Sequence, residues 1–174
     1  MGLIEINNPI EGALGPLRID GAPSAGASNV QTITFADTWG GGDTFKLNYN
    51  GEVTADISWS GTNGTLTTNI KNGLNALEGI GADGVSVAVD SGVSGIGTWN
   101  ITFADKAPHP AIEVEEATVA GDGTVSVEET TPGVSPDMQG AVKGALLVDT
   151  TNAKLYINTG TPGQPAWTVV GTQS

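Results

Sequence analysis

The sequence of 174 residues has no cysteine, one histidine and one arginine. The absence of cysteine excludes a disulfide framework, a thiolate zinc site and a cysteine nucleophile, and it leaves the redox compartment undetermined. No apolar run approaches the roughly 18 residues of a membrane helix. Residues 1–20 carry acidic side chains where a secretory signal needs a basic start. We therefore predict neither export nor membrane insertion, with assembly from the cytoplasm.

Positive charge is equally scarce. Six basic residues face nineteen acidic ones, which gives a formal net charge of −13. Proteins bind nucleic acids largely by neutralising phosphates with lysine and arginine, so we predict that this protein does not bind them. A strongly acidic surface also keeps a protein soluble at high local concentration, which suits a molecule present in many copies.

The residues that usually carry catalysis are sparse. His109, between Pro108 and Pro110, has no second histidine or cysteine to share a metal with, and no serine stands in a nucleophile-elbow pattern. We predict an exposed turn residue there, and for the chain no enzymatic activity, no metal and no cofactor. Glu113 and Glu115 alternate with apolar residues, which places them on the solvent face of a strand. A calcium loop around Asp122 stays an open alternative, although the alternating oxygen ligands are missing.

What the sequence does contain is turn residues and short apolar alternations. The chain contains twenty-six glycines and nine prolines. Short strands separated by glycine- and proline-rich turns are typical of a β-sandwich or barrel. Apolar residues alternate over residues 30–35, 45–49 and 53–59, with Asn50-Gly51 predicting a tight hairpin. Between the strands, apolar residues recur at helical spacing from Leu66 to Leu77. We expect one inserted helix near residues 65–78, with Gly73 costing about 1 kcal/mol relative to alanine.

The two ends of the chain differ from the middle. In residues 1–28 the apolar residues recur at no regular spacing, and the segment ends in a Gly/Ala/Ser-rich linker. We therefore predict an extended N-terminal arm, and a disordered tail is the alternative. A second linker begins near Thr131-Pro132-Gly133, and residues 132–174 predict a small antiparallel unit, marginal alone and in need of a neighbour. The arm's apolar side chains are candidates for docking on a partner: Leu3, Ile4, Ile6, Ile10, Leu14, Leu17 and Ile19.

Four tryptophans raise the alternative of carbohydrate stacking. Trp59 and Trp99 alternate with apolar residues in predicted strands, so we expect them in the core. Trp167 closes the last hairpin. Trp39 lies in a glycine-rich turn, and we predict it as the candidate exposed platform for a glycan.

Two stretches resemble segments of tailed-bacteriophage structural proteins. Residues 30–103 are similar to an immunoglobulin-like β-sandwich module with one inserted helix that occurs in phage virion proteins. The C-terminal stretch resembles the end of phage head fibres and capsid decoration proteins. It has, in order, Ala145-Leu146-Leu147-Val148, Asp149-Thr150-Thr151, Lys154-Leu155-Tyr156-Ile157 and Trp167.

The resemblance implies a mainly β protein with an immunoglobulin-like sandwich over 29–131 and a hairpin module over 132–174. The arm over 1–28, which the sequence pattern predicts, resembles neither family. It implies a virion protein, made in the host cytoplasm, that docks on the outer surface of the capsid as a decoration (cement) or head-fibre protein. The expected partners are the major capsid protein and two further copies in a homotrimer. The alternative is a tail-fibre or baseplate-associated module that contacts host-surface glycans. Neither family has catalytic residues, so the resemblance assigns none to this sequence.

Overall fold

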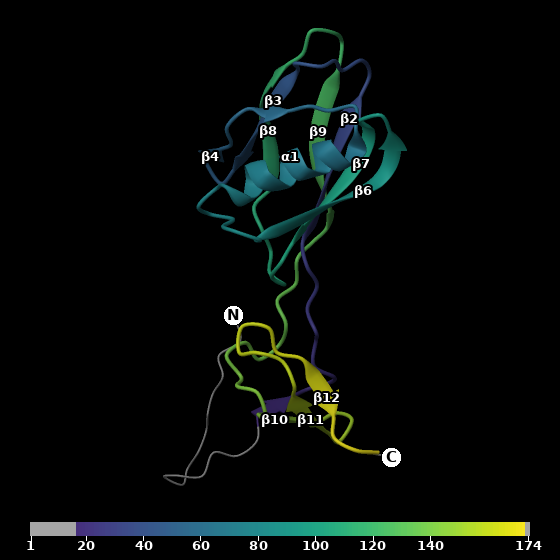
Figure 1. The fold of residues 1–174 in the computed structure, drawn as a ribbon. Coiled ribbons are helices and arrows are strands. Elements are labelled where there is room, and N and C mark those ends of the chain that lie inside the picture. Colours follow the sequence, from purple (N-terminus) through teal and green to yellow (C-terminus); the bar gives the residue numbers. More distant parts are fainter. Residues whose placement is uncertain (1–16, 173–174) are drawn as a thin grey trace. The chain divides into compact units, whose positions relative to one another are not determined.

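The computed structural model describes residues 17–172 and is mainly β, with one helix (Figure 1). It divides the chain into two compact units. One is continuous, Ala27–Val134, and we call it the sandwich unit. Of the described residues, the other combines 17–26 with 135–172, and we call it the C-terminal unit. No helix in residues 17–172 is long and apolar enough to cross a membrane.

Two antiparallel sheets form the sandwich unit. In the first, the strand order is β6-β7-β2-β9. In the second, β8 pairs along the length of β3, while β4 and β5 pair with the two ends of β3. The strands are β2 (Val30–Ala36), β3 (Thr44–Tyr49), β4 (Glu52–Val53), β5 (Ile57–Ser58), β6 (Val85–Val93), β7 (Ile96–Phe103), β8 (Ile112–Thr118) and β9 (Thr124–Thr131).

The predicted alternation of apolar residues builds the core between these sheets. Successive side chains of a strand point to opposite faces, so burial alternates along β3 and along β7 from Trp99 onward. In β2, Ile33 and Phe35 point into the core, and Thr32 is buried as well. Trp99 lies at the centre, with its ring edge-on to Phe35 at a centroid distance of 5.5 Å. The predicted β-sandwich with one short helix is confirmed.

The helix α1 (Asn63–Asn75) begins and ends slightly earlier than the sequence pattern predicts. Leu66, Ile70 and Leu74 are buried as expected. Leu77 is buried too, but it lies beyond the last turn, where the Ala76 and Leu77 amides bond back to Asn72 and Leu74. One face of α1 therefore completes the core, and its packing compensates for the glycine within it.

The hairpin at Asn50-Gly51 is confirmed. Both residues have a positive φ, 53° and 88°, and the flanking residues pair across a two-residue turn. The single strand predicted over residues 53–59 is instead divided into β4 and β5. Thr54 causes the break, because its hydroxyl accepts the Leu47 amide at 3.0 Å in place of a strand carbonyl.

A four-stranded sheet forms the C-terminal unit. Its order is β1-β10-β11-β12, from strands β1 (Leu17–Ile19), β10 (Leu146–Asp149), β11 (Lys154–Asn158) and β12 (Trp167–Val169). The last three are antiparallel, as predicted, but β1 runs parallel to β10. The prediction that residues up to 28 form an arm separate from this unit is therefore wrong at β1, because backbone pairing ties residues 17–19 into its sheet.

Candidate functional site

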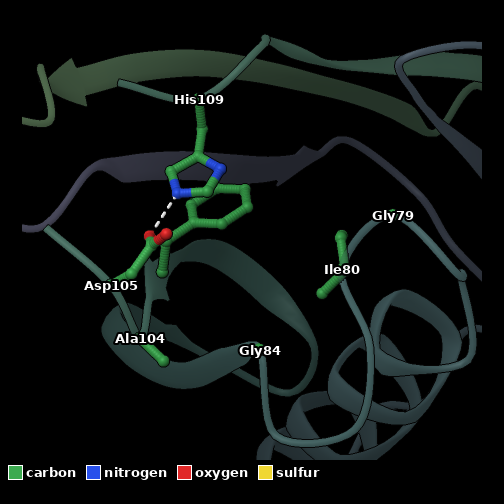
Figure 2. Close-up of a pocket in the computed structure, with 7 residues that line it drawn as sticks. Gly79, Ile80, Gly84, Ala104, Asp105 and His109 are labelled. Atoms are coloured by element: carbon green, nitrogen blue, oxygen red, sulfur yellow. Dashed lines mark hydrogen bonds and ion pairs between the residues drawn. The ribbon is translucent and has the colours of Figure 1, made fainter. Parts of the chain in front are cut away.

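A pocket of about 240 Å³ opens beside the only histidine (Figure 2). One wall comes from the turns that follow α1, with Gly79, Ile80 and Gly84. The facing wall comes from the end of β7 and the loop after it, and it is formed by Phe103, Ala104, Asp105 and His109.

His109 is held on three sides. Its ring stacks on Phe103, with a centroid distance of 3.8 Å and an interplanar angle of 13°. Nε2 donates to the Asp105 carboxylate, drawn as the dashed line in Figure 2. Nδ1 lies 2.9 Å from the Tyr49 hydroxyl, from which it accepts a hydrogen bond in the neutral ring. The side chain is only 16% exposed, so the prediction of an exposed turn residue is wrong.

The electrostatics of this group favour a structural role. Burial raises the pKa of the Tyr49 phenol, and the nearby Asp105 and Glu52 carboxylates raise it further. The hydroxyl therefore keeps its proton, and both imidazole nitrogens already have partners. The three side chains fasten the loop after β7 to strand β3. No local sequence pattern indicates this contact, because Tyr49 and His109 are 60 residues apart.

Trp39 does not form the predicted exposed platform. Only 7% of it is exposed, its ring is edge-on to Phe35 at 5.3 Å and stacked on Trp59 at 6.3 Å. The indole N–H lies 3.1 Å from the Ala36 carbonyl and 3.2 Å from the Thr124 carbonyl. With its ring packed against Phe35 and Trp59 and almost fully buried, Trp39 has no free face on which a sugar could stack.

The acidic strand predicted to face solvent does so. Glu113 and Glu115 are exposed on β8, and Glu116 forms an ion pair with Lys46 at 2.8 Å. Surface pairs of this kind contribute little to stability. Within residues 17–172, no three His, Asp or Glu side chains come together in a way that could hold a metal ion.

The predicted docking residues are only partly described. Leu17 and Ile19 are half-buried in β1, opposite Leu147 and Asp149 of β10. The other five, Leu3, Ile4, Ile6, Ile10 and Leu14, lie outside the described residues.

Two buried polar side chains organise the loops of the C-terminal unit. The Asp149 carboxylate accepts the amides of Gly21, Thr151 and Asn152 and the Asn152 side-chain amide, at 2.8–3.1 Å. Burial opposes ionisation, but these hydrogen bonds outweigh it and lower the pKa of Asp149. The Asn158 side chain likewise bridges two loops, through the Ala141 carbonyl before β10 and the Gly160 and Ala166 amides between β11 and β12. The Asp-Thr-Thr turn and the polar end of β11 are thus framework residues.

Charge is distributed unequally between the two units. The sandwich unit carries fourteen acidic residues and three lysines, a net charge of −11. The described part of the C-terminal unit carries three acidic and three basic residues and is neutral. That neutral unit also exposes aliphatic side chains, Val142 to 63% and Leu146 to 43%. Sequence reasoning missed this division because it treated the net charge as a property of the whole chain.

The comparisons with known proteins do not show a family for this chain. No family model and no curated protein matches the sequence. Among solved structures, a chain from Mycobacterium phage Patience is similar, with a TM-score of 0.37 and 17% sequence identity over 84% of this chain. This chain spans 57% of the length of that phage chain. A likeness at this TM-score carries no argument about function.

Proposed function

We propose that this protein is a structural component of a tailed-bacteriophage virion that docks on the outside of the capsid as a decoration or head-fibre protein. The observation that carries the proposal is the division of charge between the two units. The neutral C-terminal unit has aliphatic side chains to bury against a partner. The sandwich unit, at −11, is suited to face solvent.

The resemblance of residues 144–171 to the end of head fibres and decoration proteins supports the same role. Those residues form the larger part of the sheet in the C-terminal unit, as a docking module requires. The major capsid protein is the proposed partner, and capsid stabilisation or display of the sandwich is the proposed effect. The expected absence of enzymatic activity and the homotrimer stay predictions.

Immunogold labelling of intact virions with antibody to this protein tests the proposal first. Label over the head is the expected result. Label confined to the tail would contradict the proposal and would favour the tail-associated alternative.

A binding assay separates the contribution of the N-terminal segment. Deletion of residues 1–28 would remove β1 from the sheet of the C-terminal unit, so it cannot distinguish lost docking from a damaged unit. Deletion of residues 1–16 keeps β1 and removes five of the seven predicted docking side chains. If those residues dock on the capsid, this variant should stay folded and no longer bind capsids that lack the protein. Binding as strong as that of the full chain would refute the arm's role.

A further inference from the structure

The two edges of the first sheet in the sandwich unit differ in how they are covered. One edge is β6, and side chains of α1 bond to its outer backbone groups near both ends. Asn75 bonds to the N–H and the C=O of Val85, at 2.9 and 3.2 Å, and Asn63 donates to the Gly92 carbonyl at 3.1 Å. The other edge is β9, which pairs with β2 on one side only.

The register of the sheet shows which backbone groups of β9 point outward. Because Val85 turns its backbone away from β7, its partner Phe103 turns toward β2, and the Phe103 N–H donates to the Asn29 carbonyl at 3.0 Å. The same alternation, carried across β2, gives the residues of β9 that bond to β2: Thr124, Ser126 and Glu128. The residues between them point their N–H and C=O groups outward: Val125, Val127 and Glu129. Within residues 17–172, no strand or side chain bonds to these outward groups.

The side chains along this edge are of two kinds. Four valines on β9, on the neighbouring β8 and in the turn between them are only partly buried against the core: Val114, Val119, Val125 and Val127. Four exposed carboxylates lie on the same two strands: Glu113, Glu115, Glu128 and Glu129. None of these four forms an ion pair within the part of the chain that the structure describes. The edge thus combines open backbone groups, apolar surface and unneutralised negative charge.

We propose that the outer edge of β9 binds an extended segment of another protein as an added strand, and that this segment alternates apolar and basic residues. Main-chain hydrogen bonds to Val125 and Val127 would hold such a segment, and its alternate side chains would set the specificity. The carboxylates select lysine or arginine on one face of the segment, and the valines select apolar residues on the other. They also disfavour a second copy of β9, because like charges on paired strands repel. This surface lies in the sandwich unit, so the proposal does not rest on capsid docking by the C-terminal unit.

A capped decapeptide that alternates lysine and valine is the probe, titrated against the full-length chain. Isothermal titration calorimetry should detect binding that weakens as salt is added. Amide hydrogen exchange locates the contact. In the free protein, the amides of Val125 and Val127 should exchange faster than those of Ser126 and Glu128, and saturating peptide should slow the first pair at least about tenfold.

Two N-methylated versions of the peptide separate strand pairing from charge attraction. An added strand bonds to β9 through alternate residues only, so methylation of all valine nitrogens and methylation of all lysine nitrogens should affect binding unequally. The set that faces β9 should lose binding when methylated, and the other set should keep it. Equal binding of the two methylated peptides would overturn the proposal.

Charge-neutralising variants test the role of the carboxylates without disturbing the core. Glu113→Gln combined with Glu128→Gln should raise the dissociation constant of the lysine–valine peptide at least about threefold. The matched control combines Glu78→Gln with Asp90→Asn, which makes the same change of charge after α1 and on β6, the opposite edge strand, and it should have a smaller effect. Absence of binding to the wild type would overturn the proposal, as would equal effects of the two double variants or unchanged exchange at Val125 and Val127. Tail-confined immunogold label would refute the proposed function and leave these results unaffected, so the two failures are distinguishable.

Discussion

Gly73 provides a sharp test of the packing between α1 and the second sheet of the sandwich unit. On an exposed helix, replacing glycine with alanine should stabilise the protein by about 1 kcal/mol. At Gly73, however, the added Cβ would lie 2.7 Å from Ile57 Cδ1 and 2.8 Å from Ile57 Cγ1. Ile57 is buried on β5 and cannot turn away into solvent. Overpacking a core typically costs about 1–3 kcal/mol.

The two effects at this position oppose each other, and the clash should dominate. We expect Gly73→Ala to lower the free energy of unfolding by about 1 kcal/mol, within a range of about 0–2. Gly64→Ala, in the same helix, is the matched control, because its added Cβ would have no neighbour within 4 Å. That variant should be as stable as the wild type or more stable. Guanidinium denaturation, followed by the fluorescence of the sandwich-unit tryptophans, measures both.

A double-mutant cycle identifies the cause. Ile57→Val removes Cδ1 and alone should cost about 0.5–1.5 kcal/mol. In the Gly73→Ala background it should cost less, because it removes the closest contact, with Cδ1, although Cγ1 remains, and the difference is the coupling energy. Equal costs in both backgrounds, or a Gly73→Ala variant more stable than Gly64→Ala, would refute the reasoning.

Three further predictions follow from the buried polar and aromatic groups. Trp39→Ala should destabilise the sandwich unit by about 3–5 kcal/mol in thermal denaturation, with Trp39→Phe costing less, because the indole fills the core. Since the pKa of Tyr49 is raised in the fold, the wild type should lose stability as the pH rises above about 10, where the unfolded chain releases the phenolic proton first. Tyr49→Phe should lose less stability than the wild type when thermal melts are recorded from pH 7 to 11. An equal loss of stability in the two proteins would contradict the assignment of this pH dependence to Tyr49. Since the pKa of Asp149 is lowered, its contribution should be present above the ordinary aspartate value of about 4 and disappear as the pH falls below it. The amide resonances of Thr151 and Asn152 should then shift in the wild type and stay constant in Asp149→Asn.

Elements set by local patterns could be predicted from the sequence. The Asn50-Gly51 hairpin requires two residues that tolerate a positive φ, and the helix requires a stripe at positions 66, 70 and 74, so both could be located without tertiary information. The break after β4 could not, because it depends on Thr54 hydrogen-bonding to a strand seven residues earlier. The burial of Trp39 depends on contacts with Trp59 and Thr124, which no local pattern reveals.

Strand β1 is likewise not predictable from a local pattern. Leu17 and Ile19 belong to a strand of three residues, too short to show alternation, and the partner strand β10 is about 130 residues away in the chain. A parallel pairing of two chain ends leaves no turn signal between them.

The short apolar runs of the C-terminal sequence contain two signals. The runs themselves predict strands, and the lack of alternation within them predicts apolar side chains on both faces of the sheet. Leu146-Leu147-Val148 and Leu155-Tyr156-Ile157 each place apolar side chains on both faces of one sheet. The fold of the chain covers one of these faces fully and the other only in part. For the proposed role of docking on another protein, the second face is therefore a better guide than any cluster of polar residues, and it directs mutagenesis to Leu146 before the loops.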